Sequence, residues 1–223
     1  MNPGDGDSLR LVVNAEGRRV DAAILQGREW IDSETVEGNS VENLAPALRA
    51  ILARTKTKPA DLHTWIYSGG PGSLLGLRSL AMLLATWEIS NHANSISKYR
   101  YSGLVWTARE IQRTITDQPF LLISPWRTNA WNVLRVENHP ATESALEVVE
   151  GDPAADIDLP AYVLGERLRA IPPAGSQTLS LPKIETLAHH IGEPGFLVET
   201  NTIEPLQSGT TEYKKWTPTL PAQ

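Results

Sequence analysis

The sequence predicts an α/β fold built from two tandem lobes, each a mixed β-sheet with helices packed against it. Short β-prone runs separated by glycine-containing turns open the chain, and a helical pattern follows them. A second set of strand and helix patterns repeats this order more weakly. We therefore expect an N-terminal lobe over residues 1–100 and a smaller, diverged lobe over residues 101–223, whose last residues can pack back on the first lobe.

The first lobe is expected to begin with three strands in a meander, because tight turns around Gly17 and Gly27 separate the β-prone runs. A helix capped by Ser40 or Asn43 follows, with Leu44 and Leu48 on one face. A fourth strand then leads through a glycine-rich turn into a second helix. The expected strands cover residues 9–13, 20–25, 30–36 and 63–67.

The second lobe shows the same kinds of element. We expect helices over residues 101–113 and 162–170 and strands over residues 120–124, 130–136 and 145–149. The β-β-β-α-β-α order of the first lobe is that of a ribonuclease-H-like lobe. Two such lobes in tandem describe the actin-like ATPase superfamily.

Composition excludes several classes of function. The chain has 223 residues and a net charge of −6, which argues against a protein that binds nucleic acid by itself, because phosphate binding needs a concentrated basic face. It has no cysteine, which excludes a disulfide framework, a thiolate zinc site and a cysteine nucleophile. Its polar, acidic start and its lack of a long apolar run predict a cytoplasmic protein that makes no contact with a membrane.

One motif stands out. The sequence GGPGSLLGLR lies between an expected strand and an apolar helix. Its first three glycines are candidates for positive φ, Ser73 is expected to cap the helix, and Gly76 leaves room for another backbone to approach. Neither the dinucleotide-binding glycine spacing nor the G-x-S-x-G hydrolase pattern matches it. The motif residues are Gly69, Gly70, Pro71, Gly72, Ser73, Gly76, Leu77 and Arg78.

This stretch resembles the G-R-G-P-G-S-F-T-G-L-R signature of the TsaB (YeaZ) family, once called glycoproteases. Gly69 stands where arginine is usual, and Leu74-Leu75 stands where Phe-Thr is usual. Residues 38–53 and 204–216 are similar to two further segments of the family. The short chain favours TsaB over the longer TsaD proteins.

The resemblance implies a function. TsaB proteins are non-catalytic subunits that pair with a TsaD-like catalytic subunit, which makes threonylcarbamoyladenosine in tRNA. A TsaE-like ATPase is a further candidate partner. By this resemblance the chain is expected to form a homodimer when alone and to reach tRNA only through the complex.

The helix after the motif is apolar almost all round, so it needs cover on two sides. We expect Leu74, Leu77, Ala81, Leu84 and Ala85 to face the core. The resemblance implies that another subunit covers the second side, and the alternative is that the second lobe covers it. The candidate interface residues are Leu75, Arg78, Ser79, Met82, Leu83, Thr86 and Trp87.

Residues that would carry chemistry are missing where the family pattern places them. Asn14-Ala15-Glu16-Gly17 replaces an acidic turn after the first strand, and Ser124-Pro125-Trp126-Arg127 replaces an Asp-Ala-Arg turn in the second lobe. No two histidines are three or four residues apart, and we interpret His189 and His190 as surface residues. We therefore expect no catalytic residue and no metal site.

Two alternatives stay open. In the first, the chain is a divergent actin-like phosphotransferase or ATPase that binds a nucleotide through other residues. In the second, it is a paralogue that has left the tRNA pathway. We expect no tightly bound cofactor, although a weak or shared nucleotide site is compatible with the sequence. Nucleotide binding by the isolated protein would favour the enzyme.

Overall fold

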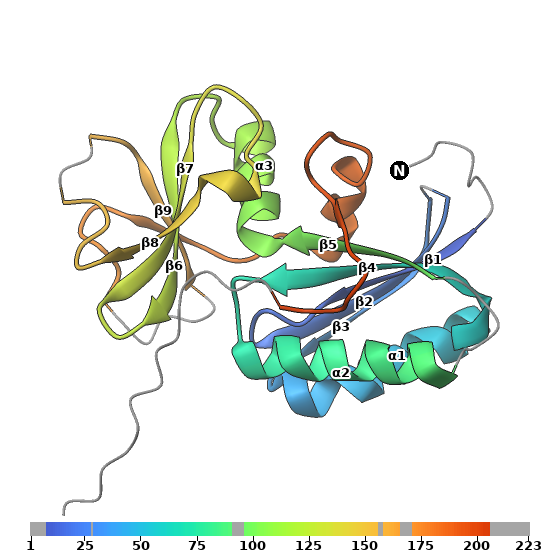
Figure 1. The fold of residues 1–223 in the computed structure, drawn as a ribbon. Coiled ribbons are helices and arrows are strands. Elements are labelled where there is room, and N and C mark those ends of the chain that lie inside the picture. Colours follow the sequence, from blue (N-terminus) through green and yellow to red (C-terminus); the bar gives the residue numbers. More distant parts are fainter. Residues whose placement is uncertain (1–7, 28, 91–95, 156–157, 166–170, 206–223) are drawn as a thin grey trace, which may run out of the picture.

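Two mixed β-sheets form the framework of the chain and lie side by side (Figure 1). The computed structural model describes residues 8–27, 29–90, 96–155, 158–165 and 171–205. Both sheets carry flanking helices, which confirms the predicted fold class of two tandem α/β lobes. The division of the chain at residue 100 stays a prediction.

The first sheet has the strand order β11-β5-β4-β1-β2-β3. Its strands are β1 (Leu9–Asn14), β2 (Arg19–Gln26), β3 (Glu29–Glu37), β4 (Leu62–Gly70), β5 (Ser97–Ser102) and β11 (Val198–Glu199). The first three strands form the expected antiparallel meander, while β4 runs parallel to β1 and β5 runs parallel to β4. β5 was not predicted from the sequence, and the helix expected from residue 101 in fact begins at Gly103, so Tyr101 and Ser102 belong to β5.

The second sheet repeats this topology with the order β10-β9-β6-β7-β8. Its strands are β6 (Phe120–Arg127), β7 (Ala130–Val136), β8 (Leu146–Glu150), β9 (Ala161–Leu164) and β10 (Gln177–Leu179). The first three form a meander, and β9 runs parallel to β6 as β4 does to β1. The helix expected over residues 162–170 is therefore wrong at its start, which lies in β9, and residues 166–170 lie outside the described residues.

Three α-helices accompany the sheets: α1 (Ser40–Thr55), α2 (Leu74–Ser90) and α3 (Gly103–Thr114). Helices α1 and α2 cover one face of the first sheet, and α3 stands between the two sheets (Figure 1). Asn39 caps α1 by accepting a hydrogen bond from the N–H of Val41, so neither expected cap residue is correct. No helix among the described residues is long and apolar enough to span a membrane.

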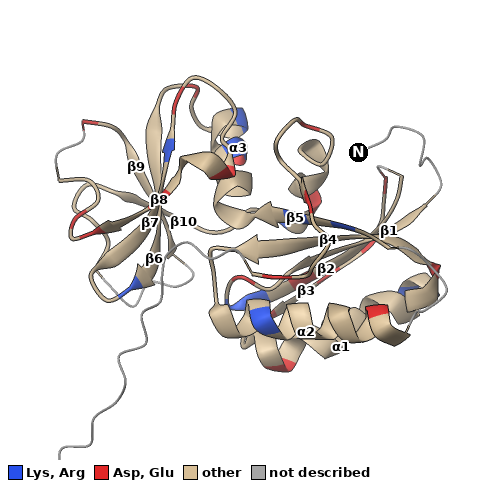
Figure 2. Cartoon of the chain, viewed as in Figure 1, with Lys and Arg blue, Asp and Glu red and all other residues tan. Residues whose placement is uncertain are grey.

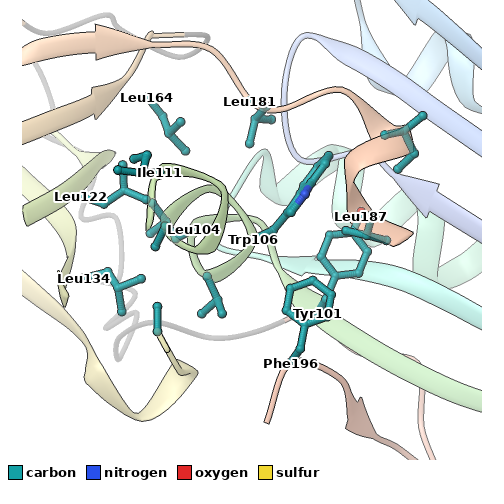
Figure 3. Close-up of a cluster of buried hydrophobic side chains, with 14 of the residues drawn as sticks. Tyr101, Leu104, Trp106, Ile111, Leu122, Leu134, Leu164, Leu181, Leu187 and Phe196 are labelled. Carbon is teal, nitrogen blue, oxygen red and sulfur yellow. The ribbon is translucent and has the colours of Figure 1, made fainter. Parts of the chain in front are cut away.

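The largest buried cluster surrounds α3 and joins the two sheets (Figure 3). Trp106 and Tyr101 are fully buried at its centre, and their rings meet edge to face with centroids 6.0 Å apart. Leucines from the second sheet close the cluster on one side, and the C-terminal segment closes it on the other. The labelled members are Tyr101, Leu104, Trp106, Ile111, Leu122, Leu134, Leu164, Leu181, Leu187 and Phe196.

The chain returns to the first sheet after β10. The short 3-10 helix η4 (Ile184–His189) packs against β2 and β3. The indole N–H of Trp30 donates to the carbonyl of Glu185 at 3.0 Å, and the guanidinium of Arg19 donates to the carbonyl of Pro182. β11 then pairs with β5, which places residues 198–199 at the edge of the first sheet. Most of the family-like segment 204–216 lies outside the described residues.

Candidate functional site

The glycine-rich turn connects β4 to α2, and one of its glycines has a positive φ. Gly70 has a φ of +108°, a conformation that favours glycine, and the Gly70–Pro71 peptide bond is cis. Gly69 and Gly72 were also candidates for positive φ, but neither has it, so that expectation is wrong for both. Ser73 accepts a hydrogen bond from the N–H of Gly76 through its hydroxyl at 3.3 Å and so caps α2.

Two glycines of the motif allow close contacts. A Cβ on Gly76 would lie 2.5 Å from the carbonyl oxygen of Ala15 and 2.4 Å from the hydroxyl of Ser40, so only glycine lets α2 approach this closely. A Cβ on Gly69 would lie 2.2 Å from Cδ of Arg100 on β5. The space beside Gly69, where the family motif carries its arginine, is therefore filled by an arginine from a neighbouring strand.

The turn between β1 and β2 brings a carboxylate to this motif. Glu16 is only 1% exposed, and its Oε1 accepts hydrogen bonds from the backbone N–H of Gly70 at 3.1 Å and of Gly103 at 3.0 Å. Its backbone carbonyl accepts a third hydrogen bond, from the N–H of Ser73 at 2.7 Å. Glu16 thus joins the first turn, the glycine-rich turn and the start of α3.

Asn14, which takes the place of the acidic residue usual in the family, is already committed to local hydrogen bonds. Its side-chain oxygen accepts from the N–H of Glu16 at 3.1 Å, and its amide donates to buried Asp21 at 3.0 Å. The hydroxyl of Ser68 accepts from the N–H of Ala15 at 3.0 Å and closes the same network. The first turn is therefore a buried, internally satisfied structure.

The N–H groups around Glu16 have the geometry of an anion cradle. Backbone N–H groups at a helix N-terminus carry partial positive charge and are common ligands of phosphate and carboxylate. Gly103 is the first residue of α3, and Gly70 supplies a second N–H from another element. The charge of Glu16 also acts on its surroundings: burial raises the pKa of Tyr101 well above its ordinary value, and the Glu16 carboxylate raises it further.

The topology and this turn can be compared with known proteins. No protein-family model matches the sequence, and no curated protein matches it. Among solved structures, a protein described as similar to the peptidase YeaZ from Pseudomonas aeruginosa aligns at 16% identity and a TM-score of 0.62, over 91% of this chain and 100% of its own. YeaZ from Pseudomonas aeruginosa aligns at 15% identity and a TM-score of 0.60, over 90% of this chain and 99% of its own. The chain has the fold of YeaZ.

In this YeaZ-like fold, α2 turns an apolar side away from the sheet. Leu75 and Met82 are 65% and 71% exposed. The residues that α2 buries are Gly76, Leu77, Leu80 and Leu84. The expected core-facing stripe needs correction at Leu74, which is exposed, and at Leu80, which is buried.

The other candidate interface residues lie beside this exposed strip. Arg78 and Thr86 are exposed, while Ser79, Leu83 and Trp87 are half-buried. Leu83 and Trp87 also pack against the core between α2 and the sheet. The part that these residues play in partner binding stays a prediction.

Among the histidines, His190 contradicts the interpretation of a surface residue. It is 2% exposed, and its two ring nitrogens face the carboxylates of Glu110 at 2.7 Å and Glu193 at 3.0 Å. Arg109 donates to Glu193 at 2.7 Å, which ties α3 to the segment after η4. Within the part of the chain that the structure describes, no three His, Asp or Glu side chains are arranged to hold a metal ion.

This charge cluster predicts a specific acid sensitivity. Burial raises the pKa of Glu110, but hydrogen bonds from Arg113, His190 and His189 outweigh burial and hold that pKa below its ordinary value of 4.5. The pKa of Glu193 is lowered in the same way, because hydrogen bonds from His190 and Arg109 outweigh the effect of burial. A carboxyl group with a lowered pKa stabilises the fold above its unfolded pKa and loses that contribution as pH falls through the folded value. We therefore expect Glu110→Gln to flatten the loss of stability below about pH 4.5.

Glu143 provides a control of opposite sign. Burial raises the pKa of Glu143 above 4.5, and its ion pair with Arg100 at 2.8 Å does not fully offset this. Its contribution to stability is complete below its unfolded pKa and is lost as pH rises through the folded value. Glu143→Gln should therefore make the free energy of unfolding fall more steeply as the pH decreases. Urea unfolding between pH 7 and pH 3 measures both variants, and equal pH slopes in the two would contradict the assignment.

Three parts of this arrangement have no recognisable signal in the sequence. Glu16 stands in the turn that replaces the family's acidic turn, and nothing in that turn predicts that its carboxylate accepts the N–H groups of Gly70 and Gly103. Arg100 and His190 lie in stretches without a recognisable motif. The distance in sequence explains the misses, because Glu16 meets N–H groups 54 and 87 residues away.

Proposed function

We propose that this chain is a TsaB-like, non-catalytic subunit that binds a TsaD-like catalytic partner in the threonylcarbamoyladenosine modification of tRNA. The exposed apolar side of α2, on a fold like that of YeaZ, carries the proposal. The same side of α2 is the proposed contact between two copies of the chain when it is alone. A TsaE-like ATPase would bind to the complex that results.

The composition of the α2 side supports a protein partner. Leu74, Leu75 and Met82 leave apolar surface in contact with solvent, and such clusters on a soluble protein often mark an interface. Arg78 and Glu88 lie near the two ends of the helix and provide a polar rim. Trp87, half-buried beside this surface, is a candidate aromatic anchor.

The distribution of charge supports an indirect role toward tRNA. In the view of Figure 2, basic and acidic segments are scattered over both sheets rather than gathered on one face. The whole chain has a net charge of −6, which repels a polyanion. We propose that tRNA is bound by the complex, and that this subunit contributes a surface for the partner.

The filled anion cradle supports a non-catalytic role. A nucleotide phosphate at the N-termini of α2 and α3 would meet the Glu16 carboxylate, and two anions do not share such a site without protonation. Asn14 is held by Glu16 and Asp21 and so is not available as a metal ligand. The proposal therefore includes no cofactor bound by this chain.

A double substitution on α2 tests the proposed interface. Leu75→Glu with Met82→Glu places two charges in the centre of an apolar contact, where unpaired charges are costly to bury. Both side chains are largely exposed, so the variant should stay folded, with a melting temperature close to that of the parent. We expect at least a tenfold weaker affinity for the TsaD-like subunit of the same cell, and a monomer in sedimentation.

The matched control carries the same change at apolar residues away from α2. Ile115 and Ile171 are exposed, and their double replacement by glutamate should leave dimer and partner binding intact. Leu83 is a poor choice for such a test, because it packs against the core and its loss would weaken the fold. An α2 variant that still dimerises and still binds the partner would place the interface elsewhere.

A further inference from the structure

The Glu16 carboxylate is held as a bound anion would be held. Its Oε1 receives N–H groups from two separate elements, Gly70 at the end of β4 and Gly103 at the start of α3. A buried carboxylate is costly unless hydrogen bonds compensate the loss of water, and charge-assisted bonds from oriented N–H groups do so. The side chain is almost inaccessible to solvent, so these bonds are made inside the protein.

The backbone around the carboxylate is shaped to receive it. A Cβ on Gly103 would lie 1.8 Å from Oε2 of Glu16, so glycine is required for the carboxylate to reach the helix start. Ser102 caps α3 by accepting the N–H of Val105, which leaves the N–H of Gly103 for Glu16. The helix that follows has 12 residues, enough for a helix dipole that favours an anion at this end.

We propose that Glu16 is an internal anion that fills a preformed oxyanion cradle, and that this cradle accepts a small carboxylate once the Glu16 side chain is removed. The site is thus a ligand site with its ligand built into the chain. The inference goes beyond the proposed partner binding and does not depend on it. It predicts an anion preference that can be measured on the isolated protein.

Two consequences follow for the molecule. Glu16 locks the β1–β2 turn to the glycine-rich turn and to α3, because its side chain and its carbonyl together contact Gly70, Ser73 and Gly103. It also keeps this end of the first sheet closed to phosphate, since an incoming anion must displace it first. Removing the side chain should loosen the three segments and leave two inward N–H groups without their acceptor.

Chemical rescue tests the proposal. We expect Glu16→Ala to melt several degrees below the parent, because buried N–H groups lose a charged partner. Sodium acetate or formate should restore most of that loss in a saturable way, since a ligand that binds only the folded state raises its stability. Sodium chloride at the same ionic strength is the reference, and inorganic phosphate shows whether the cradle takes a larger anion.

The controls separate the cradle from a general salt effect. Glu16→Gln keeps the side-chain volume and should gain no more from acetate than from chloride, because no space is free. Glu147→Ala removes an exposed carboxylate on β8 and should respond like the parent. If acetate and formate raise the melting temperature of Glu16→Ala no more than that of the parent, the proposal is wrong, whatever the outcome of the partner-binding experiment.

A second measurement applies if Glu16→Ala does not fold. Glu16→Gln replaces a charged acceptor by a neutral one, so the amide proton resonances of Gly70 and Gly103 should both move relative to the parent and exchange faster with solvent. The N–H of Val105, which donates to Ser102, serves as the internal reference. Unchanged resonances and unchanged exchange at Gly70 and Gly103 would overturn the assignment of Glu16 as their anion.

Discussion

Replacing Trp106 by alanine is expected to lower the free energy of unfolding by about 3–5 kcal/mol, the usual cost of deleting a buried aromatic side chain. Trp106 is fully buried on α3, where it meets Tyr101 edge to face and donates its indole N–H to the hydroxyl of Thr186 at 3.2 Å. The substitution leaves a cavity between the two sheets and removes a contact with η4. For a chain of this size the melting temperature should fall by roughly 10 °C, measured by thermal and urea unfolding.

Trp126 offers a matched control. It is half-buried at the end of β6, and the guanidinium of Arg127 stacks on its ring at 4.4 Å. Trp126→Ala removes the same side chain from a partly exposed position, so we expect a loss near 1 kcal/mol, the size of an exposed cation–π contact. If the two variants lose equal stability, the cluster around α3 is not the main junction of the molecule.

Strands could be predicted from the sequence where the local apolar pattern agrees with the pairing that the strand makes in the sheet. β1 and β4 are apolar runs bounded by polar or turn residues, and the strands that the sequence predicts there are the ones observed. β5 was missed because its sequence, SKYRYS, is polar. Its cations are tolerated because Lys98 pairs with Glu88 and Arg100 pairs with Glu143, and such distant partners leave no local periodicity.

β9 shows how tertiary pairing can override a local pattern. The stretch AYVLGERLRA has apolar residues at helical spacing, so it predicts a helix. Its first four residues are buried, and the first three of them pair with β6 in parallel, which fixes this stretch as a strand. The cap of α1 was missed for a more local reason, because Asn39, Ser40 and Asn43 are all good cap residues and only backbone geometry selects Asn39.

Only the glycine-rich motif of the candidate site could be predicted from the sequence. The glycine-rich motif is visible in the sequence because the positive φ of Gly70 and the cap that Ser73 makes depend only on residues of the motif itself. Its carboxylate ligand is not visible, because nothing around Glu16 indicates which N–H groups it will meet. The same limit applies to α2, where apolar residues lie on every side of the helix and packing alone decides that Leu80 is buried and Leu74 is exposed.

Gly70→Val should destabilise the glycine-rich turn in two ways. Valine at a φ of +108° is strained by about 1–3 kcal/mol, because its branched Cβ collides with the backbone. The N–H of Gly70 also donates to Glu16, so any shift of the backbone weakens a hydrogen bond to a buried carboxylate. Together these effects should cost on the order of 3 kcal/mol in urea unfolding.

Two other glycines separate the two contributions. Gly151 has a φ of +85° with no atom within 4 Å of where its Cβ would lie, so Gly151→Val measures backbone strain alone and should cost less than Gly70→Val. Gly72 lies in the same turn but lacks a positive φ, so Gly72→Val should escape that strain. A loss for Gly72→Val as large as that for Gly70→Val would contradict the strain argument. A loss for Gly151→Val as large as that for Gly70→Val would leave no role for the hydrogen bond to Glu16.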